Sequence, residues 1–305
     1  MSALVSPFGF ATTAAEVVDG LDLTGRRVVV TGGASGIGVE TARALASIGA
    51  DVTLAVRNTG AAAPVVDDLV AGTGNPGVHV SWLDLADRAS IAEFVASWTG
   101  PLDVLVNNAG VLALPELERT AEGWEMQFAT NFLGHFALTL GLYRALAAAS
   151  DGARVVSLSS SGHLFSPVIF DDLHFDFVPY DPYLAYGQSK TATALLAVGV
   201  TARWAADGIT ANAVMPGAIA TKLQRHTGGL RTPPERQKTP EQGAATTVFA
   251  ATSPLLAGIG GRYLEDVQEA RVVHRRGPDY TGVAPYALDP ANAERLWDVS
   301  QRMLD

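Results

Sequence analysis

The sequence predicts an α/β fold in which helices cover a parallel sheet. Apolar runs rich in β-branched residues alternate with longer segments of helical character along most of the chain. Such β-α-β-α alternation is typical of parallel strands joined by right-handed helical crossovers. The Gly-Pro-rich stretches at 216–240 and 277–290 do not separate two independently foldable halves. We therefore expect a single domain over residues 25–305, preceded by an N-terminal extension over residues 1–24.

Short apolar runs bounded by turn residues are the expected strands. They lie at 27–30, 52–56, 78–83, 104–106, 155–158 and 209–214, with 262–264 as a short seventh. Between them we expect a helix ending at Ile48, one over 87–98, one from about Glu122 to Ala149, and one that carries Tyr186 and Lys190. Asp289 and Pro290 provide an N-cap and a first-turn proline, which predicts a last helix over 290–304.

Composition excludes several classes of function. The net charge is −10 and no basic patch dominates, which argues against nucleic-acid binding. The chain has no cysteine, so disulfides, thiolate chemistry and cysteine metal sites are excluded, and its scattered histidines predict no metal site. We find no basic leader followed by an apolar run and no apolar stretch long enough to span a membrane. We expect a cytoplasmic protein.

A glycine-rich loop directly after the first expected strand indicates a dinucleotide site. Residues 31–38 read Thr-Gly-Gly-Ala-Ser-Gly-Ile-Gly and open the next helix. The glycines let the backbone approach a ligand, and the helix N-terminus offers N–H groups and a positive dipole end to a pyrophosphate. Glycines also mark ordinary turns, so the loop's place in the first βα turn supports the assignment. The expected contacts are Gly32, Ser35, Gly36, Ile37 and Gly38.

Tyr186 and Lys190 are spaced so that both side chains share one face of a helix. A lysine ammonium beside a phenol favours the phenolate, so we expect Lys190 to lower the pKa of Tyr186 from about 10. Such a tyrosine exchanges a proton with a carbonyl or alcohol oxygen as a general acid or base. Together with the glycine loop, the pair predicts hydride transfer to or from a nicotinamide.

Three motifs in this order resemble the classical short-chain dehydrogenase/reductases. They are Thr-Gly-x-x-x-Gly-x-Gly at 31–38, Asn-Asn-Ala-Gly at 107–110 and Tyr-x-x-x-Lys at 186–190. The resemblance covers roughly residues 24–265 and implies a Rossmann-type, doubly wound parallel sheet of about seven strands that binds NAD or NADP.

The same resemblance implies four catalytic residues. Ser160 would orient the substrate oxygen toward Tyr186, and Lys190 would also bind the nicotinamide ribose. Asn131 would interrupt a helix and hold a proton relay to the lysine. An exposed helical asparagine, a poor helix former, is the alternative for Asn131.

Further cofactor contacts follow from the resemblance. Asp84 would hold the adenine amino group, although it is also placed to cap the helix over 87–98. The segment after the sixth strand would contact the nicotinamide and phosphates. The remaining implied contacts are Leu85, Asn108, Ala109, Gly110, Pro216, Gly217, Ile219 and Thr221.

The end of the second strand bears on the choice of cofactor. An acidic residue there would bind the ribose 2′-hydroxyl of NAD and repel the 2′-phosphate of NADP. This strand instead ends in Val56, Arg57 and Asn58, with no acid before Asp67. Arg57 is either a surface residue or the partner of that phosphate. We favour NADP(H), with NAD(H) as the alternative.

Residues 162–183 form an insert between Ser160 and Tyr186. Its Phe-Asp-Asp-Leu at 170–173, followed by Ala-Tyr-Gly-Gln-Ser-Lys at 185–190, is similar to the retinol-dehydrogenase-like and WW-domain-oxidoreductase-like branch of the family. That branch favours lipophilic carbonyls and NADP(H). Apolar residues of the insert either wall a pocket or pack as structure, while residues 216–240 are expected to close over the site as a substrate loop. The apolar candidates are Phe165, Val168, Ile169, Phe175, Phe177, Tyr180 and Tyr183 in the insert, with Leu223 and Leu230 in the loop.

These observations predict an NADP(H)-dependent oxidoreductase that interconverts a lipophilic ketone or aldehyde and its alcohol. The family resemblance adds the expectation of a homodimer or homotetramer. A serine hydrolase is disfavoured because Ser160 lacks the leading glycine of a Gly-x-Ser-x-Gly elbow. A dinucleotide-binding regulator without turnover, an NAD-dependent secondary-alcohol dehydrogenase, and epimerase or dehydratase chemistry remain as alternatives.

Overall fold

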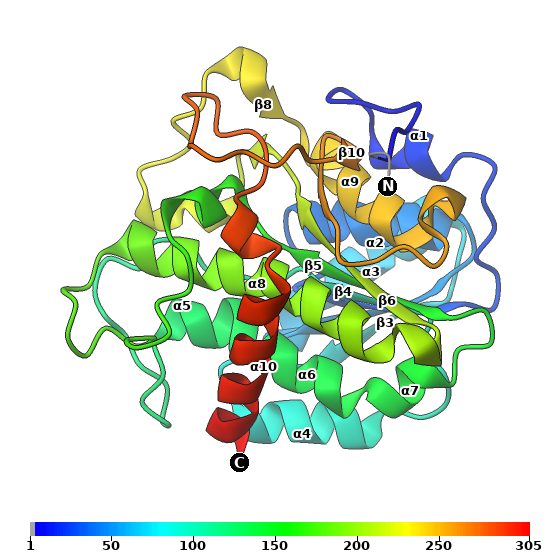
Figure 1. The fold of residues 1–305 in the computed structure, drawn as a ribbon. Helices are drawn as coiled ribbons and strands as arrows, with labels where there is room; N and C mark the ends of the chain where they lie inside the picture. Colours follow the sequence, from blue (N-terminus) through cyan, green and yellow to red (C-terminus); the bar gives the residue numbers. More distant parts are fainter. Residues whose placement is uncertain (1–3) are drawn as a thin grey trace.

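A computed structural model describes residues 4–305 as an α/β fold on one eight-stranded sheet (Figure 1). The strand order is β10-β9-β6-β5-β4-β1-β2-β3, and all neighbours are parallel except the edge pair β9 and β10. Because β2 lies on one side of β1 and β4 on the other, the topological switch point falls between β1 and β4. The doubly wound sheet is confirmed, with eight strands where about seven were expected.

The strands follow the expected apolar runs to within two residues. They are β1 Arg27–Thr31, β2 Asp51–Val56, β3 Val78–Trp82, β4 Val104–Asn107, β5 Ala153–Leu158, β6 Ile209–Met215, β9 Tyr263–Glu265 and β10 Gln268–Glu269. Two short strands, β7 Ala218–Ile219 and β8 Gln237–Lys238, pair outside the main sheet. Their pairing ties together the two ends of the expected substrate loop.

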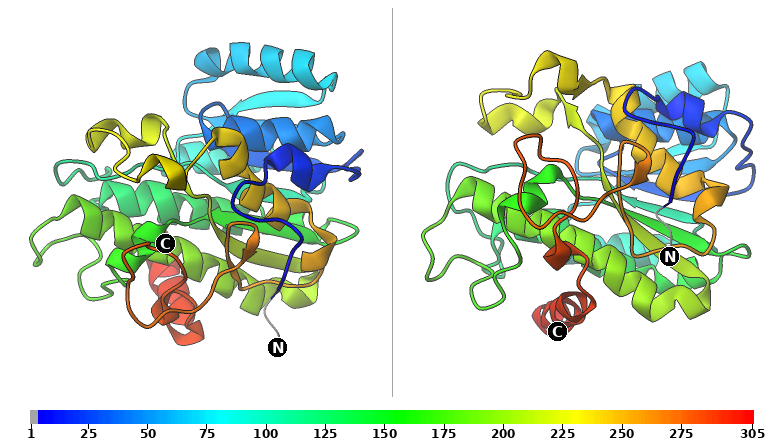
Figure 2. Two further views of the ribbon diagram at one scale, coloured as in Figure 1. Left: turned by 90° about the horizontal axis from the view of Figure 1, so that it is seen from above. Right: turned by 45° about the horizontal axis from the view of Figure 1, so that its top comes forward.

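Helices cover both faces of the sheet, as the views in Figure 2 show. Helix α2 packs against α9, and α1 lies outside α9, around one core; α4, α6 and α8 surround the other core, with α10 packed on α8. None of the helices within residues 4–305 is both long and apolar enough to cross a lipid bilayer. The bounds are α1 Ala14–Val18, α2 Ile37–Ser47, α3 Thr59–Thr73, α4 Arg88–Ser97, α5 Met126–Phe128, α6 Gly134–Gly141, α7 Tyr143–Ala147, α8 Pro182–Trp204, α9 Pro240–Thr252 and α10 Pro290–Leu304.

The expected helical stretch from about Glu122 to Ala149 is confirmed over 126–147, but it is divided into α5, a π-helical turn at 129–133, α6 and α7, and the π-turn contains Asn131, where an interruption was expected. The first of these elements, α5, begins at Met126. The buried Glu125 carboxylate caps it by accepting hydrogen bonds from the N–H groups of Gln127 and Phe128 at 2.9 and 2.6 Å. Burial raises the pKa of Glu125 to about 7. A π-turn widens the helix locally and commonly marks a functional position.

The described part of the N-terminal extension packs on the folded body. The Ser6 hydroxyl donates to the carbonyl of Val267 at 2.6 Å, and the Ser6 N–H donates to the Gln268 side chain at 2.9 Å. Val17 and Val18 of α1 are buried in the same core as α9. At the other end of the chain, the predicted Asp289 cap accepts the Asn292 N–H at 2.8 Å and starts α10.

Candidate active site

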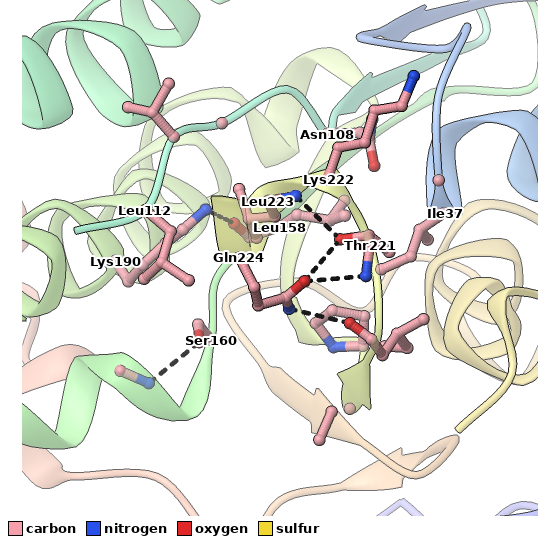
Figure 3. A pocket seen from close by; sticks show the side chains of 18 of the residues that line it. Ile37, Asn108, Leu112, Leu158, Ser160, Lys190, Thr221, Lys222, Leu223 and Gln224 are labelled. Carbon is pink, nitrogen blue, oxygen red and sulfur yellow. Dashed lines mark hydrogen bonds between the residues drawn. The ribbon is translucent and has the colours of Figure 1, made fainter. Parts of the chain in front are cut away.

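A cavity of about 1280 Å³ lies at the carboxyl ends of the parallel strands. Its walls include nearly all of the cofactor and catalytic residues that the sequence indicated. Those lining it are Gly32, Ser35, Gly36, Ile37, Arg57, Asp84, Leu85, Asn108, Ala109, Gly110, Ser160, Tyr186, Lys190, Pro216, Gly217, Ile219 and Thr221. Gly38 and Asn131 are buried and do not line it. Figure 3 shows Ile37, Asn108, Ser160 and Lys190 arranged around this space.

The glycine loop fits the phosphates of a dinucleotide. Gly36 is the N-cap of α2, adopts φ of +54°, and provides no side chain to cap the helix. A Cβ on Gly38 would lie 2.6 Å from the Gly32 carbonyl oxygen, so a larger residue would open the turn. The Asn108 side chain donates to the Thr31 carbonyl at 2.7 Å and holds β4 against the loop. The helix N-terminus therefore faces the cavity without a capping side chain, as an anionic pyrophosphate requires.

At the adenine end, Asp84 does not cap a helix. The cap of α4 is Asp87, which accepts the Ala89 N–H at 2.9 Å, so the capping alternative for Asp84 is wrong. The Asp84 carboxylate accepts the Ala86 N–H at 2.9 Å and remains on the cavity wall. The side chain is therefore held locally and is available to a ligand.

Arg57 is exposed at the cavity rim immediately after β2. Its neighbour Asn58 caps α3 by accepting the Ala61 N–H at 2.9 Å, which fixes the turn. Arg57 itself forms no hydrogen bond or ion pair with any residue that the structure describes. A guanidinium without a protein partner is thus placed beside the dinucleotide site.

Tyr186 and Lys190 lie on α8, whose residues from Ala185 to Val200 are all buried. Lys190 Nζ donates to the Leu158 carbonyl at 2.8 Å and lies 5.7 Å from the Tyr186 ring centroid (Figure 3). Burial raises the pKa of Tyr186 to about 12, an effect opposed by a hydrogen bond with Ser160. Burial also lowers the pKa of Lys190 to about 8.

The expectation that Lys190 lowers the pKa of Tyr186 is therefore wrong for this state of the site. Desolvation disfavours the charged form of each group, so the phenol becomes a weaker acid and the ammonium a stronger one. The lysine directs its hydrogen bond to a backbone carbonyl instead of the phenol. Tyr186 is consequently a protonated phenol at neutral pH.

Among the neighbouring serines, Ser160 is the one that affects the pKa of Tyr186. The Ser159 hydroxyl donates to the Lys190 carbonyl at 2.8 Å and is turned toward α8. Ser160 Oγ accepts the Gly162 N–H at 3.1 Å, and Ser160 is the serine that opposes the rise in the pKa of Tyr186. A Cβ on Gly162 would lie only 2.6 Å from Tyr186 Cε1, so the turn and the ring are in close contact.

Asn131 is fully buried in the π-helical turn, which rules out the alternative of an exposed helical asparagine. Its Oδ1 accepts the Val111 N–H at 2.8 Å, and its Nδ2 donates to the Ser189 hydroxyl at 2.9 Å. Asn131 thus joins the segment after β4 to the residue that precedes Lys190 on α8.

The insert contributes only part of the substrate end of the cavity. Phe165 and Tyr183 line it, whereas Val168 and Phe175 are buried in the protein and Phe177 is 88% exposed. Ile169 is outside the lining, and the Tyr180 hydroxyl donates to the Leu114 carbonyl at 2.9 Å. Of the two alternatives left open for the insert, packing as structure holds for most of its apolar residues, and lining the cavity holds for Phe165 and Tyr183.

The substrate loop contributes more, with Leu223 and Leu230 on the cavity wall. Thr221 and Gln224 cap its first turn: the Thr221 N–H donates to Gln224 Oε1 at 2.8 Å, and Gln224 Nε2 donates to the Ile219 carbonyl at 2.9 Å (Figure 3).

The sequence reasoning missed lining residues from the two ends of the chain. These are Phe10, Glu265, Asp266, Pro278, Asp279, Tyr280 and Thr281. The only sequence signal for the last four was the Gly-Pro-rich character of 277–290.

Comparisons with known proteins agree with this geometry. The family model described as short chain dehydrogenase matches residues 26–229. The "Probable oxidoreductase" of Streptomyces antibioticus is 54% identical, over 91% of this chain and 97% of that protein. The polyprenol dehydrogenase of Mus musculus is 42% identical, over 81% of this chain and 77% of that protein. The crystal structure of an uncharacterised protein from Mycobacterium paratuberculosis is 32% identical, with a TM-score of 0.75 over 96% and 97% of the two chains.

The family match spans the glycine loop, the Asn-Asn-Ala-Gly segment and the Tyr-Lys pair, and these motifs meet in one cavity. The chain therefore belongs to the classical short-chain dehydrogenase/reductase family and is an NAD(P)-dependent oxidoreductase.

Proposed function

We propose that this protein uses NADP(H) to interconvert a lipophilic ketone or aldehyde and the corresponding alcohol. One observation carries the proposal. A single cavity is lined by the glycine loop, by an arginine that has no partner among residues 4–305, by Ser160 and Tyr186, and by apolar side chains from several segments. Each part supports a different element of the proposed function.

The nicotinamide, when bound, supplies or accepts the hydride. Tyr186 supplies the proton in the direction of reduction, because a phenol whose pKa is about 12 is fully protonated at neutral pH. Ser160 lines the same cavity as Tyr186 and would bond the same substrate oxygen. Lys190 provides positive charge beside the tyrosine and would hold the nicotinamide ribose.

Arg57 supports the preference for NADP(H). It follows β2, the position where an acidic residue would select the 2′-hydroxyl of NAD. Because it has no partner among the described residues, it can pair with a 2′-phosphate without breaking an existing contact. Charge-assisted hydrogen bonds of this kind are typically worth about 1.5–3 kcal/mol, or roughly 10- to 100-fold in affinity.

Apolar side chains support a lipophilic substrate. Phe165, Tyr183, Leu223 and Leu230 line the cavity beyond Ser160 and Tyr186. Ligand pockets of this kind take apolar molecules, and a few polar groups fix their orientation. The similar mouse protein is named for polyprenol, a lipid alcohol, which fits the same substrate class.

Fluorescence titration with NADPH and NADH tests the cofactor assignment. We expect wild-type protein to bind NADPH at least about tenfold more tightly, and Arg57→Ala to remove most of that preference while NADH affinity stays unchanged. Arg275→Ala is the matched control, because Arg275 is exposed and does not line the cavity. Equal affinities for the two cofactors in the wild type would contradict the assignment.

A further inference from the structure

A buried histidine that the proposed mechanism does not use lies beside Ser160. His163 has none of its surface exposed and occupies the 3-10 turn that begins after Ser160. Its ring contacts the backbone of Ser160 on one side and the backbone of Ala284 on the other, at 2.7 and 3.1 Å. A fully buried imidazole whose two nitrogens both form hydrogen bonds is fixed in orientation. The two contacts together determine the tautomer of the ring and the segments that it joins.

The contact with Ala284 fixes the tautomer of the ring. A backbone N–H can only donate, so Nε2 of His163 must accept from Ala284 and carries no hydrogen. The ring hydrogen is therefore on Nδ1, which donates to the Ser160 carbonyl oxygen at 2.7 Å. Burial lowers the pKa of His163 to about 4, so the neutral ring persists at neutral pH.

Tyr263 gives the same carbonyl a second donor. Its hydroxyl donates to the Ser160 oxygen at 3.0 Å and lies 3.0 Å from His163 Nδ1, whose hydrogen it can accept, and its ring packs on the imidazole with centroids 4.8 Å apart. The Tyr263 side chain is buried, and burial raises its pKa well above the ordinary value, so it remains a donor. Two buried side chains thus converge on one backbone oxygen of the residue that faces Tyr186.

His163 also connects this turn to the far wall of the cavity. Its carbonyl accepts the Tyr286 hydroxyl at 2.8 Å, in addition to the Ala284 contact. Residues 278–281, just before these two partners, line the substrate end of the cavity. One residue therefore bonds both to the Ser160 turn and to the segment that encloses the substrate.

We propose that His163 and Tyr263 are positioning residues. Through Nδ1–H and the phenol they hold the Ser160 backbone so that its hydroxyl meets Tyr186, and through Nε2 His163 anchors the 278–287 segment against the substrate. The inference rests on the oxidoreductase function proposed above. Neither residue touches the reacting atoms, and neither exchanges a proton during turnover.

Two substitutions separate the two contacts of the ring. In His163→Asn the amide nitrogen takes the place of Nδ1 and keeps the donor to Ser160, while the acceptor for Ala284 is lost. In His163→Gln the side-chain oxygen reaches the place of Nε2 and keeps that acceptor, while the donor to Ser160 is lost. We expect His163→Asn chiefly to raise KM for the carbonyl substrate, and His163→Gln chiefly to lower kcat by about tenfold, as loss of a buried donor predicts.

Tyr263→Phe is a milder variant that removes the second donor to Ser160 together with the hydroxyl's contact with His163 Nδ1 at 3.0 Å, and we expect it to lower kcat about 3- to 10-fold. NADPH affinity, measured by fluorescence, should be unchanged in all three variants, because neither residue lines the cavity. This measurement also establishes that each variant is folded.

A double-mutant cycle with Ser160→Ala decides whether the histidine acts through the serine. Once the Ser160 hydroxyl is absent, its position no longer matters, so His163→Gln and Tyr263→Phe should each lower kcat less than twofold in that background. Undiminished effects in the Ser160→Ala background, or equal kcat and KM changes in His163→Asn and His163→Gln, would overturn the positioning role. If wild-type protein binds NADPH but reduces no carbonyl compound, the proposed function fails, and the inference fails with it for that separate reason.

Discussion

Replacing Gly162 by alanine should displace the catalytic tyrosine without touching it chemically. Gly162 lies in the turn after Ser160, and a Cβ there would lie 2.6 and 2.7 Å from two carbon atoms of the Tyr186 ring. Carbon atoms in ordinary contact are about 3.5–4.0 Å apart, so either the ring or the turn must move by about 1 Å. Because the residues around Tyr186 on α8 are buried, the helix itself has little room to shift, and the ring can move only toward the cavity that it lines.

A displacement of this size is costly for catalysis. Misplacing a catalytic group by about 1 Å costs on the order of 100-fold in rate, so we expect Gly162→Ala to lower kcat by roughly that factor. The contact between Tyr186 and Ser160 should weaken as well, because Ser160 Oγ belongs to the same turn as Gly162. The glycine loop, which would hold the pyrophosphate of NADPH, is remote from this contact and should be unchanged. NADPH affinity should therefore stay within about twofold of wild type.

Steady-state kinetics with a ketone substrate, together with NADPH titration and thermal unfolding, provide the assay. Gly72→Ala is the matched control, because Gly72 is exposed near the end of α3 and its Cβ would meet only the flexible end of Arg43, at 3.3 Å. That variant should keep wild-type kcat and gain up to about 1 kcal/mol in helix stability. If Gly162→Ala is folded and keeps kcat within threefold of wild type, close packing of the turn does not position Tyr186.

Three other predictions concern the proton, the substrate and the response to pH. Tyr186→Phe should leave NADPH affinity unchanged and lower kcat by about 100-fold or more, whereas Lys190→Ala should reduce both kcat and NADPH affinity. Full activity in Tyr186→Phe would exclude Tyr186 as the acid. Extending an alkyl ketone should raise kcat/KM several-fold per carbon until the cavity is filled, since each buried methylene is worth about 0.8 kcal/mol; a trend that falls from the shortest ketone would exclude a lipophilic pocket. Burial raises the folded-state pKa of Glu125 to about 7, above its ordinary value, so its contribution to stability is present at acidic pH and lost as pH rises through 7. The melting temperature of Glu125→Gln relative to wild type, followed by circular dichroism, should therefore improve from pH 5 to pH 8, and an unchanged difference would contradict the buried-carboxyl account.

The sheet was predictable because each strand can be recognised from its own short stretch of sequence, an apolar run between turn residues. Val28, Val29 and Val30 are completely buried, as expected for the central strand of a parallel sheet covered on both faces. Local signals also placed α10, where Asp289 caps the helix as predicted. Such features depend on residues a few positions apart, which a single sequence displays directly.

Properties that depend on distant residues were not predictable. The pKa of Tyr186 is raised by burial of its side chain on α8, an effect opposed by Ser160, and neither burial nor the Ser160 contact is visible in a spacing of four residues. The cavity wall formed by Phe10 and by residues 278–281 brings together the two ends of the chain. Periodicity reports which side of a segment is apolar, but it does not report which other segment covers that side.

The contacts of the N-terminal segment have a consequence for the order of folding. The N–H groups of Leu4 and Ser6 bond to the side chains of Glu269 and Gln268, partners 265 and 262 positions later in the chain. A chain folds progressively as it is synthesised, and contacts between remote residues form late because long loops must first close. The glycine loop and the central strands can assemble during synthesis of the chain. The contacts of Leu4 and Ser6 form only after Gln268 and Glu269 have been synthesised. The dinucleotide cradle is therefore expected to form before Phe10 takes its place in the wall of the cavity.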